Sequence, residues 1–199
     1  ALSLGASART LTTLADTTFT GASSGAGDLT KAGAGSLTLS GAGGLTGTVA
    51  IDAGSLITVG NGRLTSVAGV TVASGATLSL GGNETIDNLT NAGTVTLGGV
   101  LTTGATDYTF GGILNGTGAL NKAGAGTLTL SLATAHTGGT TVTAGTLLLG
   151  ASERLANTGA LTVAGGTFDL GGFSETVGAF VLAGGTVTNG HLTAASYEL

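Results

Sequence analysis

A twelve-residue phrase occurs twice in this chain, 91 residues apart. Residues 29–40 read LTKAGAGSLTLS, and residues 120–131 read LNKAGAGTLTLS. The match runs without a gap from residues 19–75 onto residues 110–166. After one skipped residue near Ala76 it resumes, so that Glu84 falls on Glu175. The chain is therefore a tandem duplication of a unit of about 91 residues.

A shorter phrase, Gly-(Ser/Thr)-Leu-x-Leu with some variation, recurs inside each unit. The intervals between successive copies are 19, 22, 17, 33, 19, 21 and 19 residues, and the long interval has room for one more strand near residues 112–114. One short strand per phrase, at a period near twenty residues, is typical of a stacked solenoid. The Ser or Thr of each phrase is Ser36, Ser55, Thr77, Thr94, Thr127, Thr146, Thr167 or Thr186.

The alternation inside each phrase predicts which side chains face the core. Leu37 and Leu39 lie on one side of a strand and Thr38 on the other, because successive side chains in a strand point to opposite faces. Burying the aliphatic side chains and exposing the threonine is the assignment that builds a core. The same pattern recurs in Leu128-Thr129-Leu130 and Phe168-Asp169-Leu170.

Composition agrees with an all-β chain. Forty glycines, many β-branched residues and the lack of apolar spacing at three and four positions disfavour helix. Collagen is excluded because there is no proline and glycine has no period of three. We therefore predict a parallel β-helix of ten or eleven turns, a rod on the order of 50 Å long at the usual strand spacing.

Charge and hydropathy exclude some classes of function. Only 8% of the residues are charged, the net charge is −5, and no basic run could follow a phosphate backbone, which argues against nucleic acid as a partner. No apolar stretch is long enough for a membrane helix. The chain has no cysteine, a weak indication of an exported protein.

We expect residues 1–199 to form one continuous domain cut from a longer protein. The chain does not begin with Met, its first residues lack the charged leader of a signal peptide, and residues 1–18 match the tail of a preceding unit. Residues 190–199 lose the repeated phrase. Both ends would expose unpaired strand edges, so we expect the rest of the parent chain to cap them.

Residues 110–131, continuing through residues 137–150, closely resemble the passenger-associated transport repeat of bacterial autotransporters, and residues 19–60 are a weaker copy. The resemblance implies a right-handed parallel β-helix, export through a C-terminal outer-membrane barrel outside this stretch, and display on or release from a Gram-negative surface. It favours a non-enzymatic stalk that assists export. An adhesin or self-association module that contacts another copy or a host glycan is the alternative, and a glycan-active enzyme is a third.

Four charged positions recur in both units, and we interpret them as corner contacts or solvated turn residues rather than as a repeated binding notch. Copies one unit apart lie too far from each other along the rod to form one site. The pairs are Asp16/Asp107, Lys31/Lys122, Arg63/Arg154 and Glu84/Glu175.

We predict no catalytic, cofactor or metal site. Carboxylate catalysis needs acids that converge, whereas the remaining aspartates have no acidic counterpart in the other unit, and only a cluster of Asp52 with Glu84 stays open. His136 stands where the first unit has Leu45, and His191 lies in the tail; two isolated histidines do not suggest a metal site. The aspartates concerned are Asp28, Asp52, Asp87 and Asp169.

Threonine pairs raise one more alternative, a flat face that orders ice-like water. Thr94/Thr96, Thr141/Thr143 and Thr186/Thr188 have the required Thr-x-Thr form. From the sequence, however, we expect these positions not to recur on consecutive turns. Gly25-Ala26-Gly27-Asp28 faintly resembles a calcium-binding nonapeptide, but a single Asp without a nine-residue repeat is too little for such a site.

Overall fold

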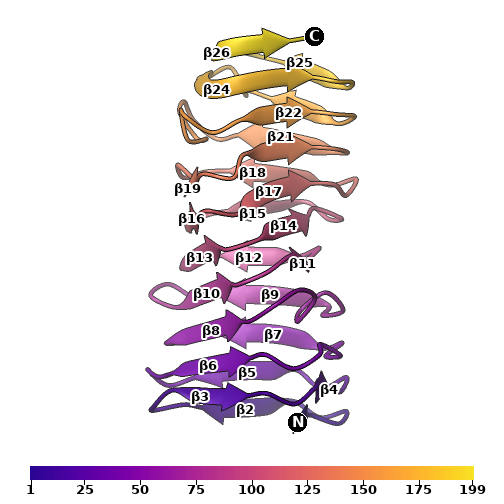
Figure 1. The fold of residues 1–199 in the computed structure, drawn as a ribbon, viewed down its shortest axis with the longest axis vertical. Coiled ribbons are helices and arrows are strands. Elements are labelled where there is room, and N and C mark those ends of the chain that lie inside the picture. The colour runs from indigo at the N-terminus through magenta and orange to yellow at the C-terminus, as the bar shows by residue number, and fades with distance from the viewer.

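The computed structural model describes all 199 residues, and every regular element is a β-strand. The chain winds upward in stacked turns, with the N-terminus at the bottom and the C-terminus at the top of Figure 1. All strand pairs are parallel. The prediction of a parallel β-helix is confirmed, while its right-handed sense stays a prediction. No helix is present that could cross a membrane.

Three parallel sheets form the walls of the coil. Face 1 has ten strands: β2 (Arg9–Thr12), β5 (Leu29–Ala32), β7 (Thr48–Ile51), β9 (Gly69–Val72), β12 (Leu89–Asn91), β15 (Tyr108–Phe110), β18 (Thr127–Leu130), β21 (Thr146–Leu149), β23 (Thr167–Asp169) and β25 (Thr186–Thr188). Because face 1 contributes one strand to each turn, the coil has ten turns, as predicted.

The other two faces have seven strands each and are staggered along the rod. Face 2 contains β3 (Thr17–Phe19), β6 (Ser36–Leu39), β8 (Ser55–Thr58), β10 (Thr77–Leu80), β13 (Thr94–Leu97), β16 (Ile113–Gly116) and β19 (Ala135–His136). Face 3 contains β11 (Glu84–Thr85), β14 (Val100–Thr103), β17 (Ala119–Lys122), β20 (Thr140–Val142), β22 (Leu161–Val163), β24 (Ser174–Leu182) and β26 (His191–Glu198). A short pair, β1 (Leu2–Ser3) with β4 (Ser23–Ser24), completes the first turn.

Aliphatic side chains stack on like neighbours along the axis and fill the interior. On face 2, Leu37 pairs with Leu56, Leu56 with Leu78 and Leu78 with Val95, at steps of 19, 22 and 17 residues. These residues belong to one cluster of 35 buried apolar residues. The predicted strand near residues 112–114 is present as β16, and the predicted inward leucines are buried.

The 91-residue unit is not a whole number of turns. From β5 the chain passes along face 1 through β7, β9, β12 and β15, then crosses β16 on face 2 and reaches β17 on face 3. The unit therefore advances four turns and two further faces. The strand that carries Lys31 lies on face 1, and the equivalent strand that carries Lys122 lies on face 3.

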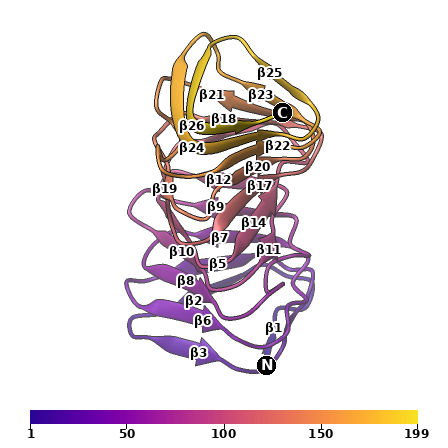
Figure 2. The same ribbon diagram turned by 45° about the horizontal axis from the view of Figure 1, so that its top comes forward.

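The second copy is thus rotated by one face relative to the first, which explains the stagger of the sheets. Each copy supplies regular strands on two faces and an irregular segment on the third. The irregular side is face 3 in the lower part of the rod and face 2 in the upper part. The strands facing the viewer in Figure 1 change accordingly, from β3, β6 and β8 below to β17, β22 and β24 above; Figure 2 shows the same change from another angle.

Two sequence-based expectations need correction or qualification. Threonines do recur on consecutive turns, because Thr127, Thr146, Thr167 and Thr186 are successive register partners on face 1. The phrase-to-phrase intervals hid this column, because phrases from different faces were counted together. Residues 190–199 lack the phrase, yet most of them form β26, which pairs with β24.

Candidate functional site

The two lysines shared by the repeats are fully buried, and their ammonium groups bind backbone carbonyls. Lys31 Nζ donates to the carbonyl oxygens of Gly33 at 2.9 Å and Ala53 at 2.9 Å, and also to that of Ala32 at 3.1 Å. Ala32 and Gly33 belong to the corner after its own strand, whereas Ala53 belongs to the following turn. The lysine therefore joins two turns.

Lys122 repeats this arrangement one unit later. Its Nζ donates to the carbonyl oxygens of Gly124 and, at 3.0 Å, Ala144, which are the counterparts of Gly33 and Ala53. A longer contact of 3.4 Å to Gly104 reaches the preceding turn. The Gly124 and Ala144 carbonyls accept no backbone hydrogen bond, so the lysine is their partner. Burial lowers the pKa of Lys31 and of Lys122, and the nearby Asp107 partly offsets this for Lys122.

A glycine in the following turn makes room for each ammonium. Gly145 has φ +62°, and a Cβ there would lie 2.4 Å from the Gly124 carbonyl oxygen and 2.5 Å from Lys122 Nζ. Its counterpart Gly54 has φ +64° and is equally crowded. The AGAG stretch after the lysine and the glycine one turn later thus form a carbonyl cage that L side chains would obstruct.

The shared glutamates also bridge turns through the backbone. Glu84 accepts hydrogen bonds from the Arg63 and Leu64 amides at 2.8 and 2.9 Å, and Glu175 from the Arg154 amide at 2.7 Å and the next amide, of Leu155, at 2.9 Å. Both glutamates are buried. Burial raises the pKa of Glu175, although the two amides oppose the shift.

Three aspartates cap the turn above in the same way but from exposed positions. Asp16 accepts a hydrogen bond from the Ser36 amide at 3.0 Å, and its counterpart Asp107 from the Thr127 amide at 2.6 Å. Asp28 accepts from the amide of Thr48 at 2.7 Å. These backbone bonds lower the pKa of Asp28, and bonds to Ser36 lower that of Asp16. In each case the carboxylate completes a backbone contact between turns.

The shared arginines bond to nearby carbonyls. Arg63 Nε donates to the Val59 carbonyl at 2.9 Å, and Arg154 Nη1 donates to the Ser131 carbonyl at 3.0 Å. All four recurring positions therefore make corner contacts, as interpreted from the sequence. Their deep burial at the lysines and glutamates was missed, although retention of a charge in both copies was the available signal.

The structure does not assemble the acidic residues into one centre. Glu84 spends both carboxylate oxygens on the corner amides of the preceding turn, while Asp52 follows β7 on another face. No three His, Asp or Glu side chains converge as metal ligands would. Asp169 binds the Gly171 amide at 2.8 Å and the Asn189 side chain. That the chain has no catalytic or metal site stays a prediction.

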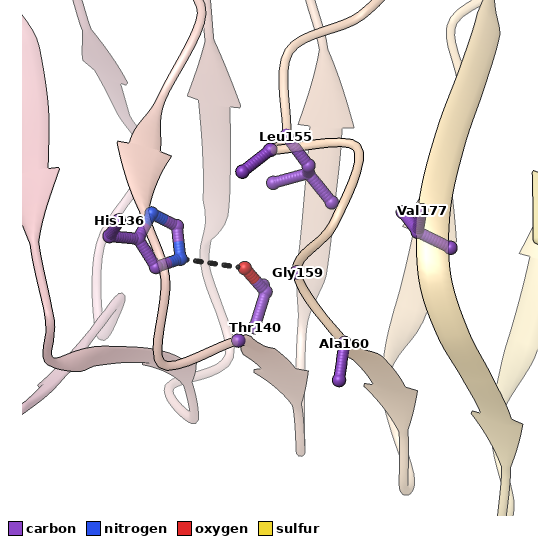
Figure 3. A pocket seen from close by; sticks show the side chains of 8 residues that line it. His136, Thr140, Leu155, Gly159, Ala160 and Val177 are labelled. Atoms are coloured by element: carbon purple, nitrogen blue, oxygen red, sulfur yellow. Dashed lines mark hydrogen bonds between the residues drawn. The ribbon is translucent and has the colours of Figure 1, made fainter.

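One small cavity lies in the irregular segment of the second copy (Figure 3). His136 from β19 is 2% exposed, and its Nε2 lies 3.0 Å from Thr140 Oγ1, while its Nδ1 is buried without a partner. Burial lowers the pKa of His136. The other histidine, His191, is exposed at the start of β26.

Comparison with known proteins agrees with this architecture. Residues 29–57 and 120–149 match the Passenger-associated-transport-repeat family. The chain contains two passenger-associated transport repeats. Both lysine cages fall inside them, apart from the Gly104 contact, and the matches lie within the predicted segments 19–60 and 110–150.

A 52-residue part of this repeat-bearing chain is 52% identical to the adhesin BmaC autotransporter of Brucella suis biovar 1 (strain 1330). The aligned part is 26% of this chain and 2% of BmaC, so the chain spans a small fraction of that relative. No solved structure matches the chain. The chain is thus an autotransporter-type passenger repeat region with partial similarity to an adhesin.

Proposed function

We propose that this chain is a non-enzymatic segment of an autotransporter passenger that serves as a stalk on a Gram-negative surface and aids export of its parent protein. A C-terminal outer-membrane barrel elsewhere in the parent chain would be its translocation partner. The repeats and the similarity to an adhesin autotransporter support this assignment.

The observation that carries the proposal is the use made of the shared polar residues. Lysine, glutamate and aspartate of the repeat all spend their hydrogen bonds on the backbone of a neighbouring turn. Residues kept for a ligand would instead converge toward solvent. A repeat that invests its charges in joining turns is suited to extending a rod turn by turn, each completed turn offering a template for the next.

The rotation of the second copy supports the same function. Equivalent residues lie on different faces, so the two copies do not build one continuous binding surface. A rod needs no such surface, because its task is to hold another region away from the cell.

An adhesive role is the second candidate, and the threonine column on face 1 favours it. Thr127, Thr146, Thr167 and Thr186 present hydroxyl and methyl groups at the spacing of adjacent strands, on a face with little charge. Such a face suits contact with another copy or with a glycan. A glycan-active enzyme remains the third and least supported alternative.

Export is tested by joining residues 1–199 to an outer-membrane barrel and measuring surface display by protease accessibility, with wild type compared to a Lys31→Met/Lys122→Met variant. The proposal expects equal synthesis but reduced display of the variant. Unchanged display would contradict the role in export. Sedimentation and cell-aggregation assays on the displayed wild type address adhesion, since concentration-independent monomers without aggregation would exclude self-association.

A further inference from the structure

The second repeat contains a polar pocket that the first repeat lacks. His136, Thr140, Leu155, Gly159 and Val177 are among the residues that line the cavity, and no second cavity occurs in the chain. The counterpart of His136 in the first unit is Leu45, which is buried in the apolar core. The duplication therefore supplies an internal reference for what the histidine adds.

One atom of the pocket is left without a hydrogen-bond partner. In Figure 3 the imidazole of His136 projects from β19 toward the segment that carries Leu155 and Gly159, with Nε2 turned to Thr140. The ring's other nitrogen, Nδ1, is buried and unpaired. Leaving such a polar atom unsatisfied costs about 1–3 kcal/mol, so native proteins rarely retain one.

We propose that this cavity is a binding site for one neutral molecule of water size, held by His136 Nδ1 and filled by an ordered water in the resting protein. The cavity offers about 10 Å³ to a water-sized sphere, close to the minimum that one water needs. Anything much larger than water is excluded by this volume.

The chemistry of the ring selects water over an ion. If Nε2 donates to Thr140, Nδ1 is an acceptor and needs a donor; if Nε2 accepts, Nδ1 carries the proton and needs an acceptor. Water can do both. A metal ion would require further ligands, and the cavity lining offers no carboxylate or thiol. The Thr140 hydroxyl provides a second polar group for the water.

The test compares wild type with His136→Leu, the substitution that the first repeat already contains. Solution NMR of the whole chain would record magnetisation transfer from water to the His136 ring and to the Val177 methyls, together with the ring-nitrogen shifts that report the tautomer. We expect water cross-peaks in wild type and their loss in His136→Leu, with the fold unchanged by circular dichroism.

Xenon provides the contrary probe, because a dry apolar cavity of sufficient size binds it whereas a hydrated one of this size does not. Xenon-induced shifts at the Leu155 and Val177 methyls of wild type, without water cross-peaks, would overturn the proposal. So would water cross-peaks of equal strength in His136→Leu. A His136→Gln variant, which retains a hydrogen-bonding side chain, is expected to keep a water signal and so guards against loss through misfolding.

Discussion

Replacing Lys122 by Met tests whether the buried ammonium, rather than the packed side-chain stem, holds the turns together. Methionine is apolar, flexible and of similar length, so it can fill the channel left by the stem. It cannot donate to the carbonyl oxygens of Gly124 and Ala144, which accept no backbone hydrogen bond. The variant therefore isolates the contribution of the ammonium.

The expected loss follows from those two orphaned acceptors. Each buried acceptor left unsatisfied costs about 1–3 kcal/mol, which gives about 2–6 kcal/mol for both. Gly124 and Ala144 are only partly buried, so water can reach their carbonyls and the lower part of the range applies. Removing the cost of burying a charge offsets the loss further. We predict that Lys122→Met lowers the free energy of unfolding by about 2–4 kcal/mol.

Urea unfolding followed by far-UV circular dichroism measures this loss, provided that the slopes of the variant and wild type agree. Arg9→Met is the control, because it removes the same charge from an exposed side chain and should change stability by less than about 0.5 kcal/mol. Lys31→Met should behave like Lys122→Met. A Lys122→Met variant as stable as wild type would show that the cage contributes no net stability and refute the reasoning.

Three further changes test other parts of the structure. His136 has a pKa below its unfolded value, so the unfolded state binds more protons and stability falls as pH drops below about 6.5; His136→Leu should abolish this part of the pH dependence in urea titrations, and an unchanged profile would contradict it. Glu153 adopts φ +54° where its counterpart Gly62 has φ +69°, so Glu153→Gly should raise stability by about 0.5–1 kcal/mol, and a lower melting temperature would show that the Glu153 side chain outweighs the backbone strain. Gly145→Ala should destabilise by more than Gly75→Ala in chemical unfolding, because both have positive φ but only Gly145 is crowded by a neighbouring turn; equal losses would contradict the cage geometry.

The period of the coil and the orientation of its strands were predictable because they depend on local patterns. An aliphatic residue at every second position has to face the interior, and glycine has to occupy tight corners. Leu37 and Leu39 are buried and Thr38 is partly exposed, as the alternation predicted. No long-range information is needed for that inference.

The arrangement of one copy relative to the other was not predictable in the same way. It depends on the remainder when 91 residues are divided by a turn length that varies from 17 to 22 residues, so small errors per turn accumulate to a whole face. The burial of Lys31 and Lys122 was equally hidden. A lysine usually lies in solvent, and only the three-dimensional corner shows carbonyls placed to receive its ammonium.

Disulfide formation between register partners tests the stacked coil most directly. Thr146 and Thr167 are neighbours on face 1, where adjacent parallel strands lie about 4.8 Å apart, within the range that a disulfide can span. A Thr146→Cys/Thr167→Cys variant should form an intramolecular disulfide on mild oxidation, whereas Thr146→Cys/Thr186→Cys, two turns apart, should not. Failure of the first pair, or equal cross-linking of both, would contradict the parallel one-turn register on which the account depends.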